Sequence, residues 1–145
     1  MDEVTRLVGE CILTPLKRIS DAKGDIYHAI KSTDITFAGF GEAYFSTVYF
    51  KIVKGWKQHS KMTLNLVVPI GHIRFHLRFA DGNEYKSVDL GPSNYQRLTV
   101  PPGIWLAFEG VGLDQNLLLN VASIPHNPLE AVVMPLETFS FETYR

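Results

Sequence analysis

The chain has 145 residues with a formal net charge of −1, and 46% of its residues are hydrophobic, 12% aromatic and 20% charged. This composition predicts one globular domain spanning residues 1–145 and excludes a chain that is disordered throughout. The balanced charge excludes a nucleic-acid partner recognised through bulk positive charge. The longest apolar stretch, residues 64–70, is far short of the roughly 20 residues of a membrane helix, so we expect no membrane partner.

Two features of the N-terminal part bear on the cellular compartment. The start of the chain, Met1-Asp2-Glu3, lacks the positive charge of a secretion signal. Cys11 is the only cysteine, so the chain can form neither an internal disulfide nor a cysteine-based zinc site. We therefore expect a cytoplasmic protein.

Most of the sequence has the pattern of short strands. Helical periodicity is weak, and only residues 3–9 and the stretch around Leu129 are compatible with a helical turn or two. Gly and Pro residues separate the apolar runs, and the tetrapeptide 80–83 predicts a hairpin turn. β-branched and aromatic residues predict strands at 35–37, 43–53, 63–68, 71–79, 84–90, 97–100, 104–109 and 117–122. Strands at this spacing indicate an all-β sandwich or barrel.

The clearest strand is predicted over residues 71–79, where apolar and polar side chains alternate strictly. Its polar face carries His72, Arg74, His76 and Arg78. This face either lines a barrel and binds a diphosphate, or it faces solvent or a second subunit. Arg74 is the candidate for ligand contact because it lies nearest the Gly71 turn.

Three segments resemble one family of enzymes. Residues 54–71, K-G-W-K-Q-H-S-K-M-T-L-N-L-V-V-P-I-G, are similar to the R-G-x-H-x-H/Q segment of the dTDP-4-dehydrorhamnose 3,5-epimerases and the WxcM-like dTDP-4-keto-6-deoxyglucose 3,4-ketoisomerases. Residues 90–92 and 100–105 resemble that family's L-G and I-P-P-G-V-W-H segments, and residues 120–128 resemble its closing strand and turn. The resemblance covers about residues 25–136.

The resemblance implies a double-stranded β-helix, the jelly-roll barrel of the cupins, in a homodimer. It implies a nucleotide-diphospho-sugar partner bound at the barrel mouth, in deoxysugar or surface-polysaccharide biosynthesis. No cofactor is expected, because the 4-keto group of such a sugar already acidifies the neighbouring C–H bonds. The protein need only supply a base, an acid and a group that stabilises the enolate.

Several catalytic positions of the family hold other residues in this chain. The first histidine of the motif, the base of the epimerases, falls on Lys57, while the histidine that is prominent in the ketoisomerases is retained as His59. The histidine after the family's tryptophan falls on Leu106, and no tyrosine occurs near 117–119, where the epimerases have their acid. The epimerase set is therefore absent, and the ketoisomerase set is present in part.

Three residues are candidates for the proton transfers. His59 is the candidate base, because an imidazole titrates near neutral pH. Lys57 lies two residues away, on the same side of an extended strand, where it would act as a second base or hold an enolate oxygen. Tyr44 is the candidate replacement for the missing acid. Each of these residues also has a purely structural interpretation, as a packed or solvated side chain.

The remaining candidates would bind the substrate. Lys54 replaces the family's arginine and would contact a diphosphate, and Lys61 extends the same basic cluster. Ser46 shares a strand face with the candidate acid and would donate a hydrogen bond. Trp56 and Trp105 either stack on the base or sugar, or belong to the core.

A metal site is not expected. Many cupins bind a metal through an H-x-H motif, a following acid and a later histidine. Here the motif is Lys57-Gln58-His59, no acid occurs between residues 60 and 80, and the late position is Leu106. Two functions therefore stay open, a nucleotide-sugar isomerase or epimerase acting by enolisation, and a catalytically inactive cupin that binds a nucleotide sugar or a partner enzyme. A metal-dependent oxygenase is disfavoured.

Overall fold

The computed structural model describes residues 4–79 and 83–141. These residues are almost entirely strands and loops, with three short 3-10 turns (η1–η3). The strands are β1 (Thr5–Arg6), β2 (Ile12–Pro15), β3 (Arg18–Ile19), β4 (Ile26–Tyr27), β5 (Glu42–Thr47), β6 (Val53–His59), β7 (Leu64–Ile70), β8 (Ile73–Arg78), β9 (Tyr85–Leu90), β10 (Gln96–Val100), β11 (Trp105–Gly110), β12 (Leu117–Ala122) and β13 (Ala131–Val133). The turns are η1 (Val8–Glu10), η2 (Pro128–Glu130) and η3 (Leu136–Thr138). No helix in the described ranges is long and apolar enough to cross a membrane.

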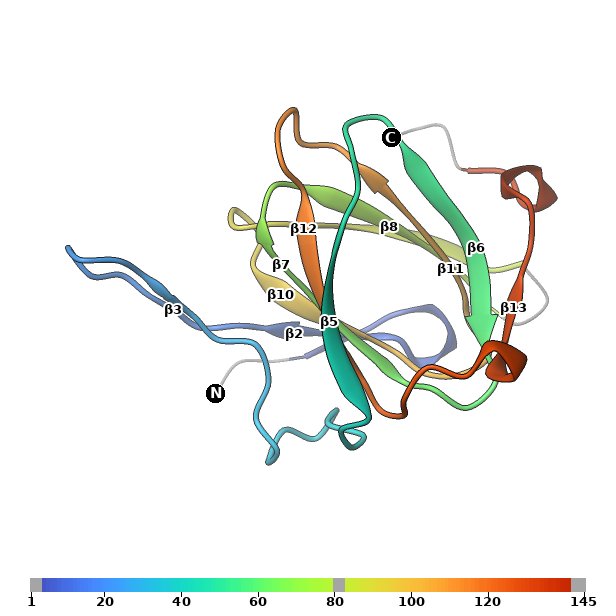
Figure 1. Ribbon diagram of the computed structural model, residues 1–145, viewed down its shortest axis with the longest axis horizontal. Coiled ribbons are helices and arrows are strands. Elements are labelled where there is room, and N and C mark those ends of the chain that lie inside the picture. The colour runs from blue at the N-terminus through green and yellow to red at the C-terminus, as the bar shows by residue number, and fades with distance from the viewer. Residues whose placement is uncertain (1–3, 80–82, 142–145) are drawn as a thin grey trace.

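Two antiparallel sheets face one another and form a jelly-roll barrel (Figure 1). One sheet has the strand order β1-β2-β10-β7-β12-β5 and the other has the order β13-β6-β11-β8-β9. A separate hairpin of β3 and β4 projects from the body of the barrel (Figure 1). The all-β sandwich or barrel expected from the strand spacing is therefore the observed architecture.

Alternating side chains of the two sheets fill the space between them. On β8 the inward residues Ile73, Phe75 and Leu77 are fully buried, as the strict alternation of this segment predicts. On β7 the inward residues Leu64 and Leu66 are also buried. This apolar core fixes which face of each strand points into the barrel, because a slip by one residue would turn every inward side chain outward.

The first half of the chain departs most from the strand predictions. Residues 43–53 form two strands of different sheets, and the chain turns between them at 48–52, where Lys51 has a φ of 67°. Residues 35–37 lie in a turn region instead of a strand. The sequence 48–52 contains neither Gly nor Pro, so its aromatic and β-branched residues were indistinguishable from a continuing strand.

Local turns agree better with the predictions. The helical turn expected around Leu129 is present as η2. The other expected helical region, residues 3–9, contains the strand β1, and η1 begins only at Val8 and has positive φ at Gly9 and Glu10. In η2 the side chain of Asn127 caps the turn by accepting a hydrogen bond from the Leu129 amide. Most of the hairpin turn predicted at 80–83 lies outside the described residues.

Candidate active site

A cavity of about 230 Å³ opens between the two sheets. Its walls come from strands that are far apart in the sequence but adjacent in the barrel. The lining residues are Tyr44 and Ser46 on β5, Lys54, Gly55, Lys57 and His59 on β6, Leu64 and Leu66 on β7, Leu106 and Phe108 on β11, and Leu118 and Asn120 on β12. Five of the residues predicted for the site therefore share one cavity, namely His59, Lys57, Tyr44, Lys54 and Ser46.

A β-bulge explains why two lysines three residues apart both reach this cavity. Leu106 pairs with Lys57 and Phe108 pairs with Lys54, so three steps along β6 oppose two steps along β11. The extra residue resets the alternation of side chains. A Cβ on Gly55 would come within 2.0 Å of Cδ2 of Leu136, so a larger residue here would displace this side chain of the C-terminal segment from the bulge.

His59 is held by a carboxylate from a distant part of the chain. Its Nδ1 lies 2.7 Å from Oε1 of Glu130, whose side chain is only 3% exposed. A carboxylate only accepts hydrogen bonds, so Nδ1 carries the proton and donates it to Glu130. In the neutral ring, the other nitrogen, Nε2, is then unprotonated and can accept a proton, as a general base requires.

The same carboxylate is fixed on its second oxygen. Oε2 accepts hydrogen bonds from the backbone amides of Lys61 and Met62, each at 2.9 Å. Burial by itself raises the pKa of Glu130, but the hydrogen bonds from the His59 ring and from these two amides outweigh burial and lower the pKa to about 2. Glu130 is therefore ionised at neutral pH and stabilises a proton on the histidine.

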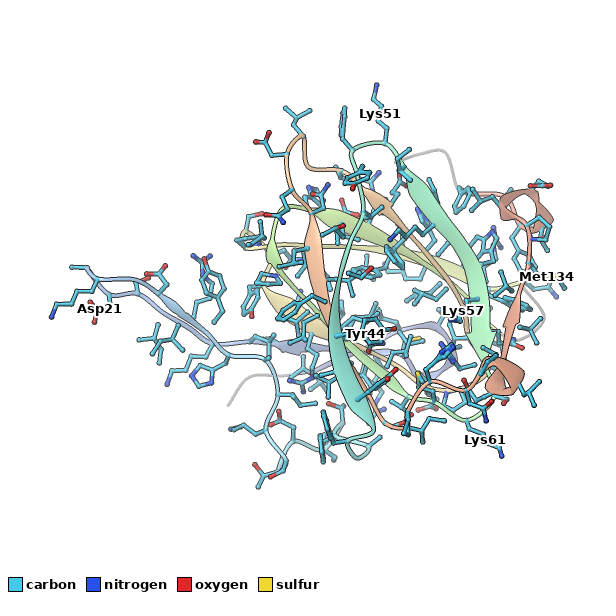
Figure 2. All side chains as sticks on the ribbon, viewed as in Figure 1. Asp21, Tyr44, Lys51, Lys57, Lys61 and Met134 are labelled. Carbon is cyan, nitrogen blue, oxygen red and sulfur yellow. The ribbon has the colours of Figure 1, made fainter. Side chains whose placement is uncertain are left out.

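Two lysines bring positive charge to the cavity. The side chain of Lys57 makes no hydrogen bond or ion pair with any described residue, and it leaves β6 toward β5 (Figure 2). Lys54 donates from Nζ to the Thr47 carbonyl at 2.6 Å and lies 6.0 Å from the centre of the Phe108 ring. The Lys57 ammonium is thus available to a ligand oxygen, whereas the Lys54 ammonium is hydrogen-bonded to the last residue of β5.

The opposite wall of the cavity carries hydroxyl and amide groups. Tyr44 on β5 lies directly opposite Asn120 on β12, and Nδ2 of the asparagine donates to the tyrosine oxygen at 3.0 Å. Ser46 lies on the same face of β5, two residues further along. A potential acid and a hydrogen-bonding group therefore face the base across the cavity.

Apolar side chains form the rest of the lining. Leu64, Leu66 and Leu118 are buried beneath the polar groups, and Leu106 is 8% exposed. Leu106 occupies the position of a family histidine, so this wall carries a hydrocarbon surface in place of an imidazole. Charges act more strongly in such a partly dry environment than in bulk water.

Both tryptophans predicted to stack on a ligand belong to the core instead. Trp56 points away from the cavity, is fully buried, and stacks on Phe141 with ring centroids 5.2 Å apart. Its indole Nε1 donates to the Leu136 carbonyl at 3.2 Å. Trp105 is 7% exposed and packs against Phe139. The C-terminal segment covers this outer face of the sheet, which the alternation of strand residues alone did not reveal.

Arg74 and Lys61 were also predicted to bind substrate, and neither lines the cavity. Arg74 lies on the outer face of β8, where Nε and Nη2 donate to the two oxygens of Asp89 at 2.7 and 2.8 Å. His72 also contacts that carboxylate, and these hydrogen bonds outweigh burial and lower the pKa of Asp89. Lys61 is exposed in the loop after β6 and points away from the barrel (Figure 2).

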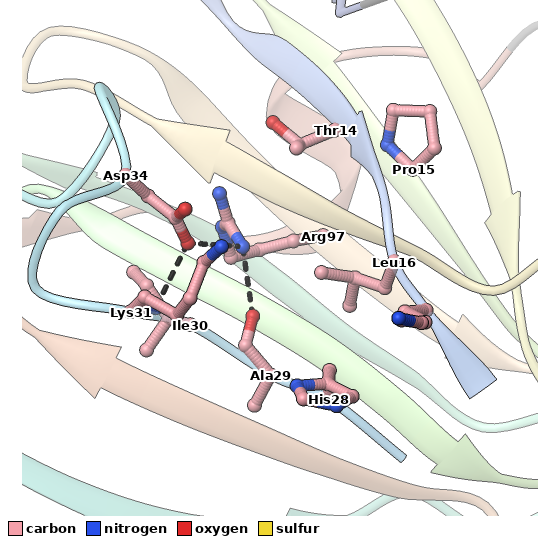
Figure 3. A pocket seen from close by; sticks show the side chains of 10 residues that line it. Thr14, Pro15, Leu16, His28, Ala29, Ile30, Lys31, Asp34 and Arg97 are labelled. Atoms are coloured by element: carbon pink, nitrogen blue, oxygen red, sulfur yellow. Dashed lines mark hydrogen bonds and ion pairs between the residues drawn. The ribbon is translucent and has the colours of Figure 1, made fainter. Parts of the chain in front are cut away.

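A second cavity, of about 310 Å³, lies outside the barrel near the base of the β3–β4 hairpin (Figure 3). Its central charge is Arg97, whose guanidinium is 1% exposed and contacts the Ala29 carbonyl, Thr36 and Asp34 at 2.7, 2.9 and 3.3 Å. These contacts tie the loop of residues 29–36 to the outer face of the sheet. The arginine therefore stabilises the fold, and the cavity lacks a base held by a carboxylate.

Within the described residues, no group of three or more His, Cys, Asp or Glu side chains is arranged to hold a metal ion. The ionisable side chains that line the cavity are Tyr44, Lys54, Lys57 and His59, the last with its carboxylate partner.

A jelly-roll barrel with a site between its two sheets is the architecture of the cupins, and the comparisons with known proteins identify the family within this class. The family described as FdtA, WxcM-like, C-terminal matches residues 9–132. The chain belongs to this family. Among curated proteins, none matches it.

Solved structures give the same result. The dTDP sugar isomerase from Desulfovibrio desulfuricans G20 is 34% identical, with a TM-score of 0.86 over 90% of this chain and 87% of that one. QdtA, a sugar 3,4-ketoisomerase from Thermoanaerobacterium thermosaccharolyticum in complex with TDP, is 22% identical, with a TM-score of 0.75 over 87% and 89%. The dTDP-4-dehydrorhamnose 3,5-epimerase from Sulfolobus tokodaii is 18% identical, with a TM-score of 0.82 over 99% and 87%. The expected cupin fold is confirmed.

Sequence reasoning missed two residues of the site, Glu130 and Asn120. The turn signal at Asn127-Pro128 predicts a change of direction near Glu130, but not that it places a carboxylate beside a histidine 71 residues earlier. Asn120 follows three leucines in a strand and resembles an outward polar residue. In a barrel with a polar cavity, an inward asparagine in such a strand marks the cavity wall.

Proposed function

We propose that the protein is a nucleotide-sugar isomerase or epimerase that acts on a dTDP-4-keto-6-deoxyhexose by enolisation. The observation that carries this function is the His59–Glu130 pair, which faces the same cavity as Lys57 and Tyr44. Membership of the WxcM-like family and the 34% identity to a dTDP sugar isomerase support the substrate class.

The reaction begins with removal of a proton from a carbon next to the 4-keto group. His59 accepts this proton on Nε2, and Glu130 stabilises the resulting imidazolium. The C–H electron pair forms a carbon–carbon double bond, and the carbonyl π electrons move to the ketone oxygen, which becomes an enolate. The Lys57 ammonium and the Tyr44 hydroxyl stabilise that oxygen. Protonation of the same carbon from its other face, by a donor other than His59, gives an epimer, and His59 then releases its proton to solvent.

An isomerase uses the same enolate differently. The ketone oxygen gains a proton, the hydroxyl on the neighbouring carbon loses one, and the histidine returns its proton to the former carbonyl carbon. The carbonyl thereby moves to the neighbouring carbon, and no oxidant, reductant or metal is consumed. A single base suffices for this shift when it reaches both carbons from one face.

The rest of the substrate lies toward the mouth of the cavity. A volume of about 230 Å³ suits the sugar, because whole ligands of drug size fill roughly 300–1,000 Å³. The diphosphate then lies near Lys54, whose ammonium exchanges the Thr47 carbonyl for phosphate oxygens. Ser46 donates a hydrogen bond from the wall opposite β6.

We also propose that the protein acts as a cytoplasmic homodimer in deoxysugar or surface-polysaccharide synthesis. Open strand edges and the projecting β3–β4 hairpin, with Ile26 56% exposed, support association with a second copy. Cys11 is the only cysteine of the chain, so no disulfide forms within it, which suits a reducing compartment. Light scattering coupled to size exclusion tests the dimer directly.

Deuterium incorporation tests the proposed function. The purified protein is mixed with dTDP-4-keto-6-deoxyglucose in heavy water, and the sugar is followed by mass spectrometry and NMR. We expect the wild type to incorporate deuterium next to the carbonyl and His59→Asn to incorporate none. His28→Asn is the matched control, because His28 lines the outer cavity instead. Tight binding without exchange in the wild type would identify a binding protein and overturn the enzymatic assignment.

A further inference from the structure

One side chain of the cavity is paired in an unusual way. Asn120 is 2% exposed, and its Nδ2 donates to the Tyr44 oxygen at 3.0 Å. Its Oδ1 is buried and has no hydrogen-bond partner among the described residues. The amide therefore makes its one side-chain hydrogen bond to the tyrosine.

The neighbouring strand shows that this fold can pair a buried amide fully. Asn65 on β7 is also 2% exposed, but it faces the outside of the same sheet. Its Nδ2 donates to the Thr36 carbonyl at 3.1 Å, and its Oδ1 accepts from the Thr99 hydroxyl at 2.6 Å. A buried carbonyl without a partner reduces stability, and such exceptions gather at functional sites.

The direction of the hydrogen bond determines where the tyrosine proton points. The Tyr44 oxygen accepts from Asn120, so its own O–H remains free to donate elsewhere. Among the described residues no acceptor is bonded to that hydroxyl. Tyr44 lines the cavity, so its proton is available to a ligand oxygen there.

We propose that Asn120 is a positioning residue that makes Tyr44 a proton donor to the ketone oxygen of the sugar. Asn120 has this role only if the proposed function holds. When His59 takes the carbon-bound proton, the Tyr44 O–H bond breaks and its proton moves to the enolate oxygen. The Asn120 N–H then stabilises the negative phenolate oxygen. A proton returns to Tyr44 when the carbonyl re-forms, from the same oxygen in an epimerase and from the neighbouring hydroxyl in an isomerase.

Asn120→Asp tests this role, because the new carboxylate is almost the same size but accepts where the amide donates. We expect kcat to fall to the level of Tyr44→Phe, about 100-fold below the wild type, which is within the range for losing a general acid. In the Tyr44→Phe background Asn120→Asp should cause little further loss, because both changes remove the same proton. Equal losses in the two backgrounds would overturn the proposal.

The pH dependence of Asn120→Asp activity distinguishes this role from a purely structural role of Asn120, which would leave that dependence the same as in the wild type. As the pH falls through the pKa of the carboxyl introduced by Asn120→Asp, that carboxyl gains a proton and can donate to Tyr44 again. The ratio of Asn120→Asp activity to wild-type activity should therefore rise toward acidic pH. A ratio that is constant or falls with decreasing pH contradicts the proposal.

Asn120→Leu keeps the proposal testable if the aspartate variant does not fold. Removing the unpaired carbonyl should leave the melting temperature unchanged or raised, while kcat falls because the tyrosine hydroxyl loses its fixed direction. Asn65→Leu is the matched control and should lower the melting temperature without lowering kcat. A fully active Asn120→Leu overturns the role of Asn120, whereas absence of exchange in the wild type overturns the proposed function itself.

Discussion

Glu130 holds the ring of His59 from a turn that lies 71 residues further along the chain. The strand β13 follows this turn directly and pairs with β6, with Ala131 opposite His59. The strand that carries the histidine and the turn that carries its carboxylate are therefore locked together by backbone hydrogen bonds. The geometry of the pair is a property of the barrel and does not depend on flexible loops.

Replacing the Glu130 carboxylate should show how much it contributes to the activity of His59 as a base. We expect Glu130→Gln to lower kcat by about 10²-fold or more, because a neutral amide stabilises the imidazolium poorly and allows the wrong tautomer. Steady-state kinetics with dTDP-4-keto-6-deoxyglucose measure the effect. Ser60→Ala is a suitable control, since among the described residues the Ser60 hydroxyl hydrogen-bonds only to the Glu130 backbone carbonyl, at 2.7 Å, and not to its carboxylate. A variant with wild-type kcat would exclude the pair from catalysis.

The same carboxylate should make stability depend on acidic pH. The pKa of Glu130 is lowered from 4.5 to about 2 in the folded state, so the folded protein is favoured above pH 4.5. This contribution, on the order of 3 kcal/mol, disappears as the pH falls from 4.5 toward 2. Urea denaturation measured from pH 4.5 to pH 2 should show that the free energy of unfolding falls more steeply with pH for the wild type than for Glu130→Gln. The same pH dependence in both proteins would show that Glu130 does not cause the loss of stability in acid.

Two titratable residues of β6, Lys57 and His59, should contribute very differently to folding. Lys57→Ala should change the free energy of unfolding by less than about 1 kcal/mol, as for an unpaired and partly exposed side chain. His59→Ala should cost about 1–3 kcal/mol, because it leaves the buried Glu130 carboxylate without its ring partner. Thermal or chemical denaturation compares the two directly. Equal losses would contradict the pairing seen in the cavity.

The placement of Trp56 outside the cavity predicts a structural phenotype. Trp56→Ala should lower the free energy of unfolding by about 3–5 kcal/mol, as for other buried aromatic residues. The folded fraction should bind TDP with unchanged affinity, as measured by calorimetry at low temperature. Trp56→Phe, which keeps most of the packing against Phe139 and Phe141, serves as the milder variant. A loss of TDP affinity in the folded protein would instead show that Trp56 contributes to the binding site.

The sequence predicted the structure correctly where a local pattern of residues also determines which side chains are buried. The alternation over 71–79 predicted both β8 and its core face, and the motif at 54–59 identified His59 and Lys57 as neighbours in one cavity. The same alternation misplaced Arg74, because a polar strand face can point into a polar cavity or out of the barrel, and the period is identical in both cases. Trp56 was ambiguous because aromatic residues serve ligands and cores equally well.

The parts that could not be predicted depend on contacts between distant segments. Glu130 reaches His59 only because β13 pairs with β6, and Asn120 reaches Tyr44 only because β12 pairs with β5. No spacing in the sequence encodes these registers. The turn at 48–52 was missed for another reason, since its positive φ falls on Lys51 and not on a glycine.

The bulge in β6 has a consequence for how this site can change over evolutionary time. If β6 had no bulge, so that three steps along it opposed three steps along β11, simple alternation would turn Lys54 to the outer surface, while Lys57 and His59 would keep their orientation through their pairing with β11 and β13. The position of Lys54, which would contact the anionic part of a substrate, therefore depends on the bulge, whereas the positions of Lys57 and His59 do not. Relatives can gain or lose the Lys54 contact without rebuilding the proton-transfer groups.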